Sequence, residues 1–200
     1  MNASSNVPAL AASLLFLFTV SNAMSQSPPL TNLQWNYTNY YTDVHPESIT
    51  NDIKWEWGKP VGGYALSIAV TNKDIVAGEQ IALFASRKNV SNSNLFVTET
   101  TPLFIYYITV KHPNGEVVPM STAGKVAYDA DKSTIDEIDS PMLRPGEKTL
   151  DTIPLRDLYD LKPGAYRVSV FIHVPVVTGS SVRGGTLDSN EIEIVVKARQ

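Results

Sequence analysis

The sequence contains no cysteine among its 200 residues. That absence excludes a disulfide scaffold, a zinc ribbon, an iron–sulfur centre, a thiol nucleophile and a lipid-modified cysteine. Basic residues are also too few for a nucleic-acid binder, because 16 Lys and Arg stand against 20 Asp and Glu and no long basic run occurs. Hydrophobic residues make up 43% of the chain, too many for an intrinsically disordered protein. The remaining class is a globular protein with one main domain.

The first 23 residues differ from the rest because they contain no charged side chain, and residues 9–20 form an almost continuous apolar run. The run is too short to cross the ~30 Å hydrocarbon core of a bilayer as a helix, but it suits the apolar core of a secretory signal. Ser21-Asn22-Ala23 offers a cleavage site. The alternative is an uncleaved apolar N-terminal helix, because no Lys or Arg precedes the run. We predict a signal peptide over 1–23 and a secreted or periplasmic protein without a membrane anchor.

From residue 53 onward, short runs of β-branched and aromatic residues alternate with Gly, Pro and Asn turn signals. This spacing predicts an all-β fold, a single antiparallel immunoglobulin-like sandwich of seven or eight strands over 57–200. A polar, aromatic-rich lead-in over 24–56 precedes it. We expect one helical turn at 158–161 and no long helix. The expected strands cover residues 64–70, 80–86, 102–110 (placed centrally), 116–120, 150–155, 166–174 and 191–196.

Tyr166 opens the longest expected strand, two residues after the Pro163-Gly164 corner. This position is typical of the tyrosine corner of immunoglobulin-like folds, in which the phenol bonds to backbone a few residues upstream. The alternative is a tyrosine that merely packs at the edge of the strand. Both interpretations place Tyr166 at the start of a strand.

Six different turn and strand signatures follow one another along the chain. They are Trp57-Gly58, Gly62-Gly63-Tyr64, Gly78-Glu79, Pro145-Gly146-Glu147, Pro163-Gly164 with Tyr166, and Ser189-Asn190. This order resembles the immunoglobulin-like sandwich of many secreted bacterial proteins of unassigned function, and more loosely the domain named for the intracellular proteinase inhibitor of Bacillus. The resemblance covers about residues 57–196. It implies a fold and no chemistry.

All three tryptophans lie between residues 35 and 57. In an extended chain Trp35, Tyr37 and Tyr41 project to one side, and Trp55 and Trp57 share a face. Exposed rings of this kind stack on sugar rings or form a protein-binding hot spot. The alternative is an extra edge strand that covers one end of the sandwich and buries its rings in the core.

The densest group of acidic residues lies at 129–139. Asp129 and Asp131 match the opening of an EF-hand loop, but Thr134 occupies the glycine position and Ser140 the position of the bidentate Glu. A looser calcium site with Asp129, Asp131 and Asp136 is one hypothesis. The other is a solvated acidic loop that joins two strands.

The three histidines, His45, His112 and His173, lack the spacing of a zinc site. The chain also has no Gly-x-Ser-x-Gly nucleophile elbow. Residues 178–185 are rich in glycine but lack the end of a phosphate loop. We expect them to form a flexible hairpin between the last two strands, with Arg183 as an anchor for a partner.

These observations predict an exported, non-catalytic binding or accessory module that uses no cofactor. It would recognise a protein or polysaccharide partner through end loops or the aromatic N-terminal segment. The alternative is a protease-inhibitor-like or envelope accessory domain that acts through a rigid exposed loop at 178–185. A secreted hydrolase has less support, because no local motif positions a nucleophile or a metal.

Overall fold

The computed structural model describes residues 53–97, 101–133, 141–178 and 181–200. All of them belong to a compact unit that spans Asn36–Gln200. The signal peptide predicted over 1–23 and residues 24–52 of the predicted lead-in therefore lie outside the described residues. Among the described helices, none has the length and apolar character that a membrane span requires.

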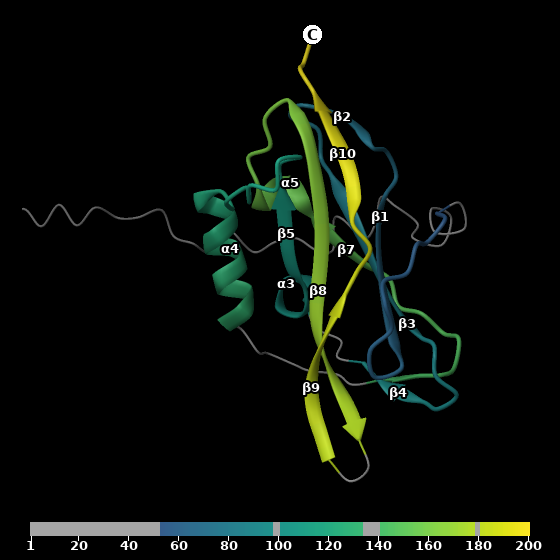
Figure 1. Ribbon diagram of the computed structural model, residues 1–200. Coiled ribbons are helices and arrows are strands. Elements are labelled where there is room, and N and C mark those ends of the chain that lie inside the picture. Colours follow the sequence, from purple (N-terminus) through teal and green to yellow (C-terminus); the bar gives the residue numbers. More distant parts are fainter. Residues whose placement is uncertain (1–52, 98–100, 134–140, 179–180) are drawn as a thin grey trace, which may run out of the picture. The chain divides into compact units, whose positions relative to one another are not determined.

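Two main sheets share one hydrophobic core (Figure 1). The smaller, sheet A, has the order β1-β3-β7, with β1 at Tyr64–Val70, β3 at Ala82–Asn89 and β7 at Asp151–Pro154. The larger, sheet B, has the order β2-β10-β8-β5, with β2 at Asp74–Val76, β10 at Ile192–Lys197, β8 at Gly164–Thr178 and β5 at Tyr107–Lys111. Strand β9 (Ser181–Asp188) also pairs with β8. The short strands β4 (Leu95–Phe96) and β6 (Met142–Leu143) pair with each other.

The core forms because the strands of sheet B carry apolar side chains at alternate positions, which all point to one face. Every second residue of β8 from Tyr166 to Val174, and of β10, is nearly fully buried, whereas the residues between them are half-buried or exposed. The buried set on these two strands is Tyr166, Val168, Val170, Ile172, Val174, Ile192, Ile194 and Val196. Residues of sheet A close the core from the other side.

The described residues confirm a strand-rich, all-β sandwich, with differences in detail. They hold ten strands, three of which have only two or three residues. Strand β2 runs parallel to β10, so the pairing is not purely antiparallel as predicted. The return strand expected at 116–120 is reduced to a single bridge between Lys111 and Val117.

The strand predicted over 102–110 is wrong in two respects: its first half is helical, and the strand that remains is not central in its sheet. Residues 102–105 form the helical turn α3 (Pro102–Ile105), because Pro102 presets a helical φ angle at the first position and Tyr106 N–H bonds to its carbonyl at 2.9 Å. Strand β5 begins only at Tyr107 and lies at the edge of sheet B. Aromatic and β-branched residues therefore mark burial here without marking a central strand.

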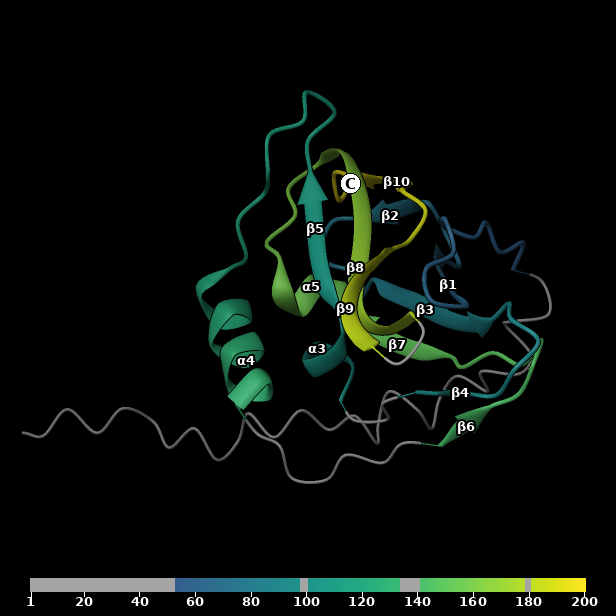
Figure 2. The same cartoon turned by 60° about the horizontal axis from the view of Figure 1, so that its bottom comes forward.

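The prediction of no long helix is also wrong. Helix α4 (Thr122–Ser133) has 12 residues, and the Ser121 hydroxyl caps it by accepting the Gly124 N–H at 2.9 Å. Lys125 and Asp129 form an ion pair one turn apart on α4. A second helical turn, α5, covers Leu155–Leu158, which is earlier than the predicted 158–161. Figure 2 shows α3, α4 and α5 gathered beside β5.

Two local features lie next to each other where β5 ends and β8 begins. At the Asn114-Gly115 turn, Gly115 has a φ of 90° and donates its N–H to the His112 carbonyl at 2.9 Å. At the start of β8, the Tyr166 hydroxyl donates to the Lys162 carbonyl at 2.7 Å. This bond back to the chain upstream identifies a tyrosine corner rather than simple packing at a strand edge.

A β-bulge separates β9 from β10. Residues 189–191 oppose only two residues of β8, because the pairing register shifts by one between the two strands. The bulge directs the Asn190 side chain to sheet A, where Oδ1 accepts the Ile68 N–H at 2.7 Å and Nδ2 donates to the Ile68 carbonyl at 3.1 Å. Asn190 thus links the two sheets, because its side-chain amide bonds to the backbone of β1 as a neighbouring strand would.

Candidate functional site

Strand β8 is longer than the sheet that supports it. Strand β5 pairs with β8 only from 167 to 171, whereas β9 follows β8 from 171 to 178. Beyond Phe171 the two strands form a two-stranded ribbon that extends past the rest of sheet B (Figure 1). We call residues 172–178 and 181–187 the β8–β9 arm.

The hairpin predicted over 178–185 forms, but the described residues 181–185 are a strand that pairs with β8 rather than a flexible segment. A Cβ on Gly184 would meet nothing within 4 Å, whereas Gly185 is closely packed. A Cβ on Gly185 would lie 2.6 Å from Val176 Cγ2 and 3.1 Å from Val61 Cγ1. Glycine in a strand marks such a close approach.

The edge of the arm that β9 does not cover lies on the side of β8 that pairs with β5 at residues 167–171. Val170 directs its backbone to the other side, since its carbonyl accepts the Ser189 N–H at 2.8 Å and its N–H donates to the Ser189 hydroxyl at 3.0 Å. By alternation, Pro175 directs its backbone to this edge, where its carbonyl lies close to Gly62, since a Cβ on Gly62 would come within 2.8 Å of it. Proline there loses no ladder bond and prevents another strand from pairing. The arm therefore offers side chains, and not a free backbone edge, to a partner.

A row of aromatic and apolar side chains runs from β5 and Phe171 of sheet B onto one face of the arm. Tyr107 stacks on its cross-strand partner Phe171, with ring centroids 4.7 Å apart and planes at 5°. His173 meets both rings edge-on, at 5.1 Å and 5.7 Å. Pro175 and Val182 continue this face along the arm, and Val182 is 68% exposed. We call Tyr107, Phe171, His173, Pro175 and Val182 the aromatic strip.

The aromatic strip was not predicted, although the sequence carries a signal for it. In the run 166–174 the β-branched residues alternate with Phe171 and His173, so these two rings must point away from the core. Tyr107 and Phe171 are half-buried, whereas His173, Pro175 and Val182 are exposed. Apolar surface left open to solvent on the outward face of a strand marks interaction sites.

Arg183 is exposed and lies on the opposite face of the arm, across from Val176. No ion pair holds its guanidinium among the described residues. Its role as an anchor remains a prediction. The structure separates it from the aromatic strip.

The predicted aromatic binding segment lies only in part within the described residues, which begin at residue 53. Trp35, Tyr37 and Tyr41 lie outside the described residues. Trp55 and Trp57 share a face, with ring centroids 6.1 Å apart and planes tilted by 31°, and both are half-buried. These two rings are therefore neither a fully exposed platform nor part of the core.

The acidic group does not form the predicted loop at its start, because Asp129 and Asp131 belong to α4. Asp129 Oδ2 accepts a bond from Lys125 Nζ at 2.9 Å, and both side chains are mostly exposed. Asp136 lies outside the described residues. Within the described part of the chain, no group of three or more His, Asp or Glu side chains is arranged to hold a metal ion.

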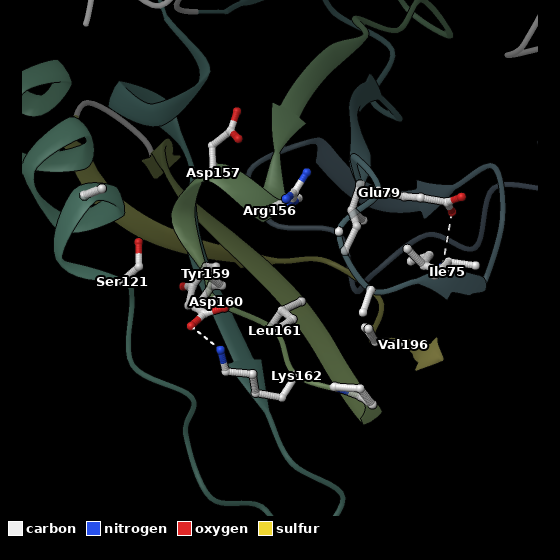
Figure 3. Close-up of a pocket in the computed structure, with 16 residues that line it drawn as sticks. Ile75, Glu79, Ser121, Arg156, Asp157, Tyr159, Asp160, Leu161, Lys162 and Val196 are labelled. Carbon is white, nitrogen blue, oxygen red and sulfur yellow. Dashed lines mark hydrogen bonds and ion pairs between the residues drawn. The ribbon is translucent and has the colours of Figure 1, made fainter. Parts of the chain in front are cut away.

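A pocket of about 670 Å³ opens between the turn after β2, α5 and the start of α4 (Figure 3). Apolar side chains, among them Ile75, Leu161 and Val196, form part of its wall. Its charged residues are Glu79, Arg156, Asp157, Asp160 and Lys162. The volume suits a small ligand.

The polar groups that line this pocket already have structural roles. The Ser121 hydroxyl caps α4, and Lys162 pairs with Asp160 at 2.6 Å. The Tyr159 hydroxyl donates to the Ile108 carbonyl at 3.1 Å, and burial raises the pKa of Tyr159 to about 12. No histidine lines the pocket.

The two described histidines lie elsewhere. His173 belongs to the aromatic strip, and His112 packs on the Tyr166 ring with centroids 5.2 Å apart. Neither makes a hydrogen bond to an aspartate among the described residues. The hydrolase hypothesis gains no support from them.

No family model matches the sequence, and no curated protein matches it. Among solved structures, the chain is similar to the CARDB domain of a Pyrococcus furiosus protein, with 11% identity and a TM-score of 0.35 over 74% of this chain and 100% of that one. It is also similar to the C-terminal domain of wzt, with 12% identity and a TM-score of 0.39 over 74% of this chain and 79% of that one. A beta-glucosidase from Listeria innocua gives 14% identity and a TM-score of 0.29 over 64% of this chain, and only 16% of the enzyme is covered. At these TM-scores the likenesses carry no argument about function.

Proposed function

We propose that the protein is an exported, non-catalytic binding module with an immunoglobulin-like sandwich, and that its β8–β9 arm recognises a partner protein. The observation that carries this proposal is the aromatic strip, which runs from Tyr107 and Phe171 onto the arm. Rigid aromatic side chains that become buried at a contact supply much of the binding energy of protein interfaces. Export rests on the apolar segment at residues 1–23.

The shape of the arm favours a protein partner over a small molecule. Small ligands need a concave site that covers most of their surface, whereas the aromatic strip lies on one face of a two-stranded ribbon. A two-stranded ribbon is only marginally stable alone, so contacts with a partner would stabilise it. Because Tyr107 and Phe171 are already stacked, binding would cost little side-chain conformational entropy at these rings.

The inhibitor-like alternative has less support from the arm. An inhibitory loop must present an extended segment whose backbone is free to bond to the protease, whereas residues 181–185 are paired with β8. The tip at 179–180 lies outside the described residues. The inhibitor-like and envelope accessory roles stay predictions.

A photo-crosslinking amino acid at position 182 tests the proposal, with position 117 as a matched control. Val182 and Val117 are both strongly exposed, at 68% and 58%, but Val117 follows the turn at 112–115 and lies off the arm. In cells that export the protein, we expect one defined protein adduct from position 182 and none from position 117. Equal adducts at both positions, or none at either, would contradict the proposal.

The purified partner then allows a quantitative comparison. We expect Val182→Lys to weaken its affinity at least about tenfold, because a charge would enter a desolvated contact. Val117→Lys should leave the affinity unchanged. If the two variants bind the partner equally, the arm is not the recognition element.

A further inference from the structure

A second surface, on the outer face of sheet A, carries two lysines that face each other. Lys88 of β3 and Lys148 are bridge partners, so their side chains project from the same face of the sheet. Like charges placed directly opposite destabilise a sheet. Neither ammonium has an ion pair among the described residues. The pairing therefore persists without a carboxylate to neutralise it.

Each of these lysines instead rests on an indole ring. Lys88 Nζ lies 5.7 Å from the centroid of Trp57, and Lys148 Nζ lies 5.8 Å from that of Trp55. The segment that holds both rings is fixed to the sheet, because the Ser67 hydroxyl donates to the Glu56 carbonyl at 2.6 Å. We call Trp55, Trp57, Lys88 and Lys148 the Lys–Trp face.

The Lys–Trp face has unused binding capacity. Exposed cation–π contacts are worth only ~0.5–1 kcal/mol each, so a carboxylate of a ligand can replace them. The indole N–H of Trp55 is buried and has no hydrogen-bond acceptor, which is rare for a buried polar group.

The charge around the Lys–Trp face is locally positive in a chain whose net charge is −4. Lys54 and Lys59, both exposed, flank the two tryptophans in sequence. The nearby acids are Glu56 and Glu147, and Glu147 is partly engaged because its Oε2 accepts the Arg144 N–H at 2.7 Å. A ligand at this surface should therefore be an anion with an apolar face for the indoles.

We propose that the Lys–Trp face binds an acidic polysaccharide built from uronate units. The carboxylates of such a chain would pair with Lys88 and Lys148, and the C–H faces of its sugar rings would pack on the indoles as the ammonium groups move aside. This binding is independent of the β8–β9 arm and goes beyond the function proposed above.

Two other anionic partners fit less well. A membrane surface requires large apolar side chains that insert below the headgroups, but Trp55 and Trp57 are half-buried and no large apolar side chain of the Lys–Trp face is exposed. Nucleic acid requires neutralisation of many phosphates, and the few lysines here are partly offset by Glu56 and Glu147.

Tryptophan fluorescence and calorimetry with de-esterified oligogalacturonate and with oligomannuronate test the proposal on the mature chain. We expect saturable binding to at least one of them that weakens as salt is added. The fully methyl-esterified oligogalacturonate, which has the same rings without the charge, should bind at least tenfold more weakly. Failure of both uronates to bind, or equal binding of the esterified form, would overturn the proposal.

Matched variants locate the site. We expect Lys88→Gln combined with Lys148→Gln to weaken uronate binding at least tenfold, and Lys125→Gln combined with Lys197→Gln to leave it unchanged. The control pair removes the same charge from two exposed lysines that already have ion pairs. Equal losses in both would overturn the assignment.

Two further measurements separate the competing explanations. Vesicles that contain phosphatidylglycerol should not compete with the uronate, and tighter binding to the vesicles would overturn the proposal in favour of a lipid surface. Val182→Lys should retain full uronate binding, so that the Lys–Trp face and the β8–β9 arm can fail independently.

Discussion

Arg87 of β3 and Asp151 of β7 form an ion pair on the core side of sheet A, with Nη2 3.4 Å from Oδ2. Only 4% of the Arg87 side chain and 14% of the Asp151 side chain are exposed. The Tyr106 hydroxyl donates to the same Oδ2 at 2.5 Å, and Arg87 Nε donates to the Thr149 hydroxyl at 3.2 Å. A charge so far from water is tolerated only with such partners.

The first prediction follows from that burial. Asp151→Asn removes the carboxylate that compensates the Arg87 guanidinium, and we expect it to lower the free energy of unfolding by about 3 kcal/mol. Asp74→Asn is the control, because it removes a carboxylate from an exposed ion pair with Lys197 and should cost less than about 1 kcal/mol. Urea unfolding of both variants measures the difference. Equal losses would mean that the buried pair contributes no more than a surface pair.

The second prediction concerns the bond between the two sheets. Asn190→Ala leaves the N–H and carbonyl of Ile68 without the side chain that satisfies both, so we expect a loss of about 2 kcal/mol. Asn72→Ala removes an exposed side-chain acceptor from the Asp74 N–H and should change stability by less than about 0.5 kcal/mol. Thermal unfolding of both variants checks this. A loss at Asn72 as large as that at Asn190 would contradict the bridging role.

Strand positions were predictable where alternation and turn chemistry agree. The run 64–70 forms β1 as expected, and 166–174 lies within β8, because each run carries a regular pattern between clear turn signals. The bulge at 189–191 could not be predicted, since it depends on how β9 and β10 each pair with β8. Its contact between Asn190 and Ile68 also joins residues that are 122 positions apart in sequence. Helix α4 was missed because its sequence, with Gly124 and few apolar residues, has a weak helical pattern.

The third prediction tests the tyrosine corner. Tyr166→Phe removes the hydrogen bond to the Lys162 carbonyl and should lower the free energy of unfolding by about 1 kcal/mol. Because the ring and its packing against His112 remain, the fold should be unchanged by circular dichroism. An unchanged free energy of unfolding would show that the corner bond has no net stabilising effect.

The fourth prediction is a pH dependence at alkaline pH. Burial raises the pKa of Tyr159 from 10.0 to about 12 in the folded protein, so above pH 10 the unfolded chain loses this proton while the folded chain keeps it. The contribution to stability is therefore complete below pH 10 and is lost as the pH rises toward 12. We expect Tyr159→Phe to lose stability less steeply than the natural chain over that range, measured by urea unfolding. Parallel losses in the two proteins would contradict a raised pKa.

The candidate site was less predictable than the fold. Residues 178–185 were singled out for their glycines, whereas in the structure residues 181–185 all pair with β8. Tyr107 and Phe171 lie 64 positions apart, and only their cross-strand register brings the two rings together. Residue type predicted which segments form strands, but the register between the strands decided which side chains meet.

The outer part of the arm, residues 175–184 with Pro175 and Val182 of the aromatic strip, can be removed to test the central claim. Val174 and Gly185 are cross-strand partners, so a two-residue Asn-Gly turn in place of residues 175–184 should close the shortened hairpin without disturbing the core. The measurement is the affinity of this variant for the protein that crosslinks at position 182, beside its unfolding temperature. We expect a folded protein with at least a hundredfold weaker binding. A folded variant that binds the partner with undiminished affinity would contradict the claim that the β8–β9 arm is the recognition element.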